Sequence, residues 1–235
     1  MKLYLSKKPK GVTIVEGFPG MGLIGTIATE FLVDHLKTEK IGSIEIEDSP
    51  AMIAIHEGRV IEPVSIYYNK QYNIVLIHAI SLGKDMGWKL SETIRQVATT
   101  LQAKEIVSLE GVGSARMDNK SEIFYYATHK AKEKQLSLIA KPLKEGIIVG
   151  TTGALMARER KIPVTALFAE THSNMPDSKA AAKLIQSLDS YLNLKVDPKP
   201  LIKQAEEFEA KIKKMLDQGQ ETDQLAKKKK LSYVG

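Results

Sequence analysis

A glycine pattern near the N-terminus is the part of the sequence best suited to chemistry. Gly20, Gly22 and Gly25 match the spacing GxGxxG, between a segment typical of a strand and one typical of a helix. Small residues in that position let backbone amides and a helix N-terminus approach a phosphate. Glu45 and Glu47 follow roughly 20 residues later, where an acid that binds a ribose would stand. Together these residues suggest a dinucleotide site.

Two features of the same loop weigh against dinucleotide binding. Phe18 and Pro19 stand between Gly17 and Gly20, so the turn differs from the dinucleotide pattern, and no residues suited to hydride transfer follow. Short glycine patterns also arise by chance, because glycine permits a sharp turn from strand to helix. We therefore favour a structural role for the three glycines and keep nucleotide binding, or an enzyme built on it, as the alternative.

The other residues capable of chemistry form no recognisable set. Ser114 lies in Gly-Val-Gly-Ser-Ala, which is not the GxSxG pattern of a nucleophilic serine. Glu110 and Glu170 each follow an expected strand, where α/β enzymes place catalytic groups, but nothing in the sequence brings them together. The Gly-Thr-Thr-Gly segment at 150–153 suits either an anion or a helix cap. We expect no catalytic residue, metal or cofactor. The histidines form no HxH or HxxxH pair and are His35, His56, His78, His129 and His172.

The composition is that of a soluble protein with a sizeable core. Hydrophobic residues make up 43% of the 235 residues and charged residues 26%. The apolar runs are too short to cross a bilayer, and the first residues lack the pattern of a signal peptide. We therefore expect a cytoplasmic protein without membrane contact. The absence of cysteine excludes disulfides, thiol catalysis and cysteine-bound metals.

Positive charge is concentrated near the C-terminus. The net charge is +6, and four lysines occupy residues 227–230. Such a run can bind nucleic acid, anionic lipid or an acidic protein surface, or it can simply be solvated. Because no aromatic and basic residues interleave elsewhere, we do not expect nucleic-acid binding.

Hydrophobic periodicity predicts strands that alternate with helices. We expect a single layered α/β domain over residues 1–196 with a mostly parallel sheet. Predicted strands lie at 12–15, 41–46, 51–55, 64–68, 72–80, 105–109 and 163–169, with a hairpin between 64–68 and 72–80. Predicted helices lie at 23–36, 91–103, 121–134, about 151–160 and 178–192, although residues 124–126 suit a strand equally well.

A last helix and a tail follow this domain. Asp197 and Pro198 open the expected helix at 197–218, because proline in a first turn loses no hydrogen bond. Its apolar stripe can pack on the domain or form an oligomer interface. After Gly219 the sequence is polar and charged, which predicts a flexible basic tail at 219–235. The stripe consists of Leu201, Ala205, Phe208, Ile212 and Met215.

Several segments resemble the proteasome assembly chaperone 2 family, especially its archaeal members. They are the glycine loop at 17–25, Glu-Gly-Val-Gly at 110–113, the segment 146–155, Pro176-Asp177 ahead of an alanine-rich helix, and Val196-Asp197-Pro198. The resemblance covers nearly all of residues 10–216. It implies a phosphorylase-like α/β fold and self-association.

The resemblance also implies a way of binding the proteasome. Eukaryotic members help to assemble the α-ring, and some archaeal relatives are homo-oligomers that dock on the core particle through C-terminal tails. That docking uses a hydrophobic–Tyr–any ending, whereas the tyrosine here is third from the end, which implies a shifted mode or a role without docking. The expected partner-binding residues are Leu231, Tyr233, Val234 and Gly235.

The resulting hypothesis is a non-enzymatic, proteasome assembly chaperone-like protein. We expect it to self-associate and to bind proteasome α subunits or the core particle, with the tail as one contact. The alternative is a nucleotide-binding protein or enzyme that uses Gly20, Gly22 and Gly25.

Overall fold

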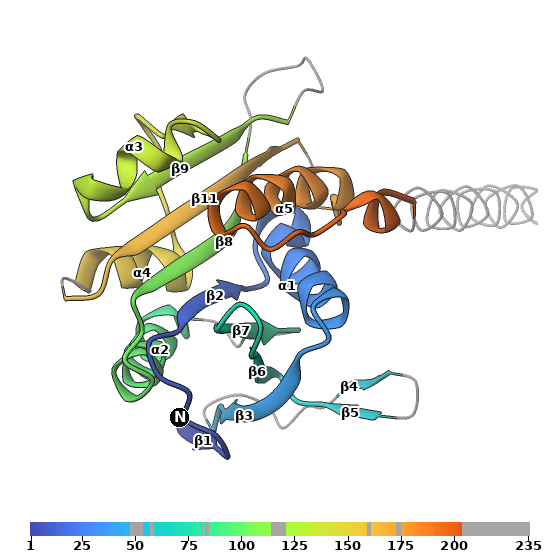
Figure 1. The fold of residues 1–235 in the computed structure, drawn as a ribbon, viewed down its shortest axis with the longest axis vertical. Coiled ribbons are helices and arrows are strands. Elements are labelled where there is room, and N and C mark those ends of the chain that lie inside the picture. The colour runs from blue at the N-terminus through green and yellow to red at the C-terminus, as the bar shows by residue number, and fades with distance from the viewer. Residues whose placement is uncertain are drawn as a thin grey trace, which may run out of the picture.

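A nine-stranded sheet runs through the part of the chain that the computed structural model describes (Figure 1). That part comprises residues 1–47, 54–56, 59–80, 82, 85–113, 121–158, 161–172 and 175–203, with only the backbone for 54–56 and 59–61. From edge to edge the strands are β1 (Lys2–Leu5), β3 (Glu39–Glu45), β6 (Val64–Asn69), β7 (Ile74–Ala79), β2 (Thr13–Gly17), β8 (Glu105–Gly113), β11 (Val164–Thr171), β9 (Ile123–Ala127) and β10 (Lys141–Pro142). A separate pair is formed by β4 (Ala54–His56) and β5 (Arg59–Ile61).

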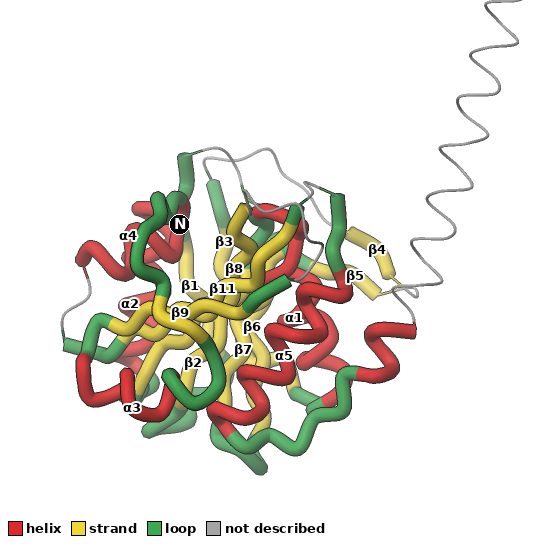
Figure 2. Tube along the Cα trace, turned by 90° about the horizontal axis from the view of Figure 1, so that it is seen from above, coloured by secondary structure: helices red, strands yellow, loops and turns green. Residues whose placement is uncertain are grey.

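Helices cover both faces of the sheet. Helices α1 (Ile24–His35) and α5 (Ser178–Leu192) lie on one face, and α2 (Gly87–Thr100) and α4 (Gly150–Arg158) lie on the other (Figure 2). Short turns are η1 (Met21–Leu23), η2 (Lys130–Lys132) and α3 (Glu133–Leu136). No helix in the described ranges is long and apolar enough to cross a membrane.

Alternating side chains divide the core into two halves. Val15 and Val107 pack with α1 and α5, while their neighbours Ile14 and Ile106 pack with α2 and α4. All four are fully buried. Successive side chains of a strand point to opposite faces, so a central strand covered on both sides is apolar throughout. The apolar pair Ile14 and Val15 of β2 fits its position at the centre, and the buried Glu16 departs from this pattern.

The sheet is parallel at its centre and mixed overall. The pairings from β7 through β2 and β8 to β11 are parallel. The β1–β3–β6–β7 side is antiparallel, as is the β9–β11 pairing, whereas β10 runs parallel to β9. The prediction of one layered α/β domain is confirmed. Its parallel character belongs to the central strands, which carry the candidate site.

Most predicted elements are present, with one exchange of type. The hairpin at 64–80 and the helix at 178–192 are confirmed, and β8 extends to Gly113. The predicted helix at 121–134 is wrong for residues 123–127, which form β9 antiparallel to β11, the structure that residues 124–126 suited equally well. Its last residues do form helical turns, in η2 and the start of α3. The local pattern of residues 124–126 suited both a helix and a strand, and pairing with β11 determined that they form a strand. Of the predicted strand at 51–55, residues 51–53 lie outside the described residues.

Helix α5 ends where its local signals place it. Asp177 accepts a hydrogen bond from the Ala180 backbone amide at 2.9 Å, which is the contact of an N-cap. Asn193 closes the helix with a left-handed backbone, φ 54°. The sequence predicted both ends because each depends on one residue near the boundary.

The start of the last helix is also described. Asp197 Oδ1 accepts a hydrogen bond from the Lys199 amide at 3.0 Å, and the helix continues to residue 203. Leu201 is buried against the α1–α5 half of the core, so the first residue of the apolar stripe packs on its own domain. Phe208, Ile212, Met215 and the tail at 219–235 lie outside the described residues.

Candidate functional site

The glycine loop brings α1 into close contact with the sheet. A Cβ atom on Gly25 would lie 2.3 Å from the Leu109 carbonyl oxygen, and one on Gly17 would lie 2.1 Å from the Gly25 carbonyl oxygen. Real Cβ atoms do not approach that closely. The backbone of the first turn of α1 therefore lies directly against the backbone of β2 and β8, which requires glycine at both positions.

The middle of the loop is fastened to β8 and to the start of α5. Gly22 has φ +65°, a conformation that glycine adopts without strain, and its carbonyl oxygen accepts a hydrogen bond from the Asp177 amide at 2.9 Å. A Cβ on Gly111 would lie 2.0 Å from the Met21 carbonyl oxygen. These contacts support a structural role for Gly22 and Gly25.

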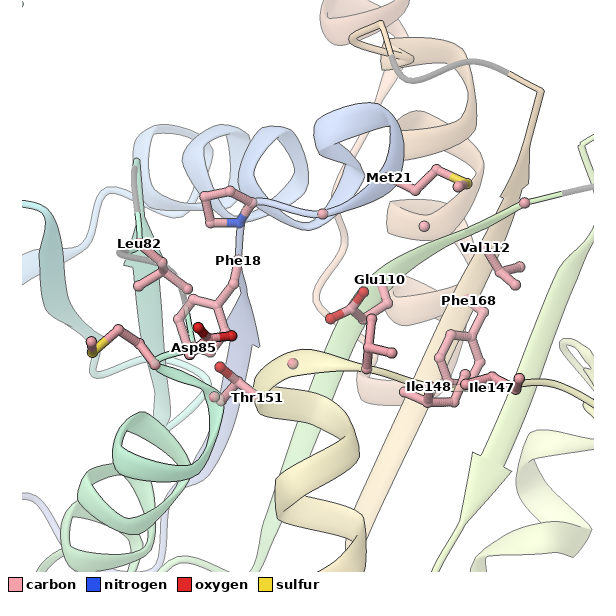
Figure 3. A pocket seen from close by; sticks show the side chains of 18 of the residues that line it. Phe18, Met21, Leu82, Asp85, Glu110, Val112, Ile147, Ile148, Thr151 and Phe168 are labelled. Carbon is pink, nitrogen blue, oxygen red and sulfur yellow. The ribbon is translucent and has the colours of Figure 1, made fainter.

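A cavity of about 570 Å³ opens at the carboxyl ends of the central strands (Figure 3). Its walls come from the glycine loop, the segment before and at the start of α2, the end of β8 and the segment before α4. The size falls within the range of sites for small ligands. Both the loop at 18–21 and the segment 147–151, singled out in the sequence for other reasons, belong to this lining.

Glu110 is the acidic group of the cavity floor. Its Oε1 atom accepts a hydrogen bond from the Thr152 hydroxyl at 2.8 Å. Its Oε2 atom faces Gly20, where an added Cβ would lie 3.2 Å away. Burial raises the pKa of the Glu110 carboxyl to about 7, and the bond from Thr152 opposes part of that rise. Glu110 therefore titrates close to neutral pH.

Glu16 on β2 lies opposite Ser108, two residues before Glu110 on β8, and is fully buried. Ser108 donates a hydrogen bond to its Oε1 atom, while its Oε2 atom has no partner among the described residues. The pKa of the Glu16 carboxyl is raised to about 8, because the effect of burial, together with the charge of Glu110, outweighs the lowering by the hydroxyl groups of Ser108 and Thr152. Glu16 is thus mostly protonated at neutral pH.

This arrangement disfavours a dinucleotide at the glycine loop. A phosphate near Gly20 would meet the carboxyl group of Glu110, which already occupies that side of the loop. The acids proposed for a ribose lie elsewhere, since β3 is separated from β2 by β6 and β7. Glu45 accepts a hydrogen bond from Tyr4 at 2.9 Å, and Glu47 pairs with Lys2 at 2.7 Å.

The remaining sequence candidates do not converge on the cavity. Glu170 accepts a hydrogen bond from the Glu122 amide at 3.3 Å and is not among the lining residues, and Ser114 lies outside the described residues. His78 contacts Thr29 at 2.9 Å, and burial lowers the pKa of its imidazole to about 4. Within the described ranges, no group of three or more acidic or histidine side chains could hold a metal ion.

The sequence did not point to Glu16 or to three of the residues that line the cavity. Asp85, Trp88 and Phe168 line that space but carry no motif. Glu16 did carry a signal, because a charged residue stood within an apolar strand at the sheet centre, where charges are rarely buried without a partner.

Exposed apolar side chains surround the mouth of the cavity. Ile147 is 91% exposed, Val149 75%, Trp88 51% and Met21 40%. All four are lining residues, so they lie around one opening. Apolar groups gathered in this way are typical of surfaces that contact another molecule.

The sequence and the fold are similar to those of known proteins. The model of the PAC2 family matches residues 14–216. Pyrococcus furiosus PbaA, described as an archaeal homolog of proteasome-assembly chaperone, has a similar structure with a TM-score of 0.83 and 29% identity, covering 97% of each chain. A Methanocaldococcus jannaschii protein, MJ0106, is 30% identical over 87% of this chain and 85% of its own. Pyrococcus furiosus PbaB, described as an archaeal proteasome activator, shares the fold with a TM-score of 0.78 at 18% identity, covering 91% of this chain and 98% of its own.

Proposed function

Because the chain belongs to the PAC2 family, we propose that it is a non-enzymatic, proteasome assembly chaperone-like protein that binds proteasome α subunits or the core particle. The observation that carries this proposal is the similarity to PbaA, which extends over 97% of both chains. The proposal includes self-association and a cytoplasmic location.

The surface around the cavity supports a role in binding rather than catalysis. Ile147 and Val149 expose most of their surface on the segment before α4. Such side chains gain free energy when a partner covers them, at roughly 25 cal/mol per Å². The glycine loop, in contrast, is engaged in packing α1 against β2 and β8. The alternative of nucleotide binding there is disfavoured by Glu110.

The proposal assigns the tail a docking role. Four lysines at 227–230 precede Leu231, Tyr233 and Val234. Lysines speed the encounter with an acidic surface and make it sensitive to salt. Tyrosine supplies a rigid contact with an apolar ring and a polar end, and several tails on one oligomer would raise the overall affinity. Residues 231–235 are thus the proposed docking peptide, with 219–230 as its tether.

Tyr233→Ala and truncation after Lys230 are each expected to weaken binding to the purified core particle about tenfold or more, because aromatic anchors dominate such interfaces. Surface plasmon resonance with immobilised core particle measures this loss. Tyr126→Ala is the matched control, because Tyr126 is 48% exposed on the folded domain. Equal binding by the intact chain and all three variants, or binding by none, would remove the support for docking through the tail.

The proposed self-association can be tested at the stripe of the last helix. Because Leu201 packs inside its own domain, we assign the interface to Phe208, Ile212 and Met215. Multi-angle light scattering is expected to give a multiple of the 26.0 kDa chain mass, and Phe208→Asp is expected to shift it toward one chain. Leu138→Asp, at a leucine that is 83% exposed, is the control. A 26.0 kDa species at every concentration would contradict self-association.

A further inference from the structure

The cavity carries negative charge in a chain that is positive overall. Among the described residues that line it, the charged ones are Glu110 and Asp85, whereas the chain has a net charge of +6. They lie on different walls, Glu110 on β8 and Asp85 just ahead of α2 (Figure 3). Arg158 is not among the lining residues, and its guanidinium carbon lies 4.3 Å from the centre of the Trp88 ring. A cavity of this kind favours a positively charged guest.

One oxygen of Glu110 is available to such a guest. Thr152 donates to Oε1 at 2.8 Å, and within the described part of the chain no hydrogen bond reaches Oε2. That atom borders the cavity on the side of Gly20. A carboxylate in apolar surroundings gains most from a donor that carries positive charge, because the pair then replaces the lost water.

The neighbouring helix ends do not reverse this preference. Helices α2 and α4 begin side by side, since a Cβ on Gly87 would lie 2.7 Å from the Gly150 carbonyl carbon. Helix N-termini stabilise negative charge nearby, and Glu110 already supplies it at the first turn of α4 through Thr152. A phosphate in the cavity would therefore meet two carboxyl groups of its own sign.

We propose that the cavity binds a primary ammonium group on an aliphatic chain, carried by a free alkylamine or by a lysine side chain of a polypeptide. The ammonium pairs with Glu110 Oε2, Asp85 on another wall adds to the negative potential of the cavity, and the aliphatic chain packs against the apolar walls, which include Phe18 and Phe168. The exposed Ile147 and Val149 at the mouth favour the polypeptide, because a small amine would leave them uncovered. This site does not depend on proteasome binding.

Trp88 gives the experiment its readout. It is the one tryptophan of the chain and it lines the cavity, so a ligand there changes the tryptophan fluorescence. The full-length chain is titrated at pH 8 with n-pentylamine, with the peptide acetyl-Leu-Lys-Leu-amide and with the same peptide acetylated on the lysine. Inorganic phosphate is the fourth probe. Circular dichroism verifies that each variant is folded.

We expect a saturable change with at least one of the two ammonium probes. Acetylation of the lysine and the Glu110→Gln variant should each weaken binding about tenfold or more, as loss of a charge-assisted hydrogen bond does. Glu39→Gln, which removes a surface carboxylate on the distant strand β3, should bind like the wild type. Tighter binding of the peptide than of pentylamine assigns the site to a polypeptide, and equal or weaker binding assigns it to a free amine.

Three results would contradict the proposal that the cavity binds an ammonium group. One is the absence of saturation with both ammonium probes. The second is equal binding of the acetylated peptide, or equal binding by Glu110→Gln. The third is a saturable response to phosphate that Glu110→Gln strengthens, because this would show that the helix N-termini, and not the carboxylates, decide which charge the cavity accepts.

Discussion

Replacing Glu16 by glutamine is expected to stabilise the fold by on the order of 3–5 kcal/mol at pH 9, and by far less at pH 5. The wild-type carboxyl is fully buried, and its Oε2 atom has no partner within the described residues. Above its pKa it is a buried charge that the hydroxyl groups near it compensate only in part, which destabilises a core strongly. Glutamine has a similar shape, can still accept from Ser108 and never becomes charged.

The direction of this pH dependence follows from the number of protons that the folded and unfolded states bind. Burial raises the folded-state pKa of Glu16 from 4.5 to about 8. Between those values the folded protein holds a proton that the unfolded chain has released, so stability is highest below pH 4.5 and falls as pH rises toward 8. One bound proton corresponds to about 1.4 kcal/mol per pH unit. Urea unfolding of both proteins at pH 5, 7 and 9 measures the difference.

Glu105 provides the control, because its carboxylate is also buried but both of its oxygens have hydrogen-bond or ion-pair partners. Its Oε1 atom accepts hydrogen bonds from Thr165 at 2.5 Å and Tyr191 at 2.7 Å, and its Oε2 atom pairs with Lys132 at 2.5 Å. Glu105→Gln should destabilise the protein by about 1–3 kcal/mol, because Lys132 loses its partner. The two substitutions thus have opposite signs. A Glu16→Gln effect that is the same at every pH would contradict the raised pKa.

The sequence predicted those parts of the fold that depend on neighbouring residues. Helix α5 was predicted from residue 178 to 192 because its alanine-rich sequence is local, and the structure ends it with local contacts as well, the Asp177 cap and Asn193. The sequence left helix and strand equally open for residues 124–126, because the pairing of β9 with β11 is a contact between distant segments. Local patterns carry no information about which strand will become a neighbour.

The candidate site shows the same division. The glycine loop was visible in the sequence, and its structural role was favoured because Phe18 and Pro19 interrupt the dinucleotide pattern. Two features were not visible, because both depend on the fold: Glu16 lies close enough to Glu110 to be affected by its charge, and Glu110 and Asp85 line one cavity. An acid on β2 and an acid on β8 are recognised as neighbours only when these two strands are known to be adjacent.

Gly25→Ala is expected to destabilise the protein by about 3 kcal/mol or more, at the upper end of overpacked cores. The new methyl carbon would lie 2.3 Å from the Leu109 carbonyl oxygen, 3.0 Å from the Phe18 nitrogen and 3.1 Å from the Gly17 Cα. All three are backbone atoms of the loop and of the sheet, so no side chain can rotate to make room. Helix α1 would have to move away from β2 and β8.

Helix propensity alone predicts that Gly25→Ala stabilises the protein. The measured change in the free energy of unfolding therefore distinguishes the two effects. Within a helix, alanine is more favourable than glycine by up to about 1 kcal/mol. Gly25 is the second residue of α1, so a gain of that size would appear if the close contact were unimportant. Gly146→Ala is the matched control, because its nearest neighbour would be a Leu143 methyl at 3.5 Å, an ordinary contact, and its effect should stay within about 0.5 kcal/mol. Urea unfolding of the three proteins at one pH compares them. A Gly25→Ala protein as stable as the wild type would show that α1 does not need glycine to pack against the sheet, and would return the glycine pattern to the class of ligand-binding loops.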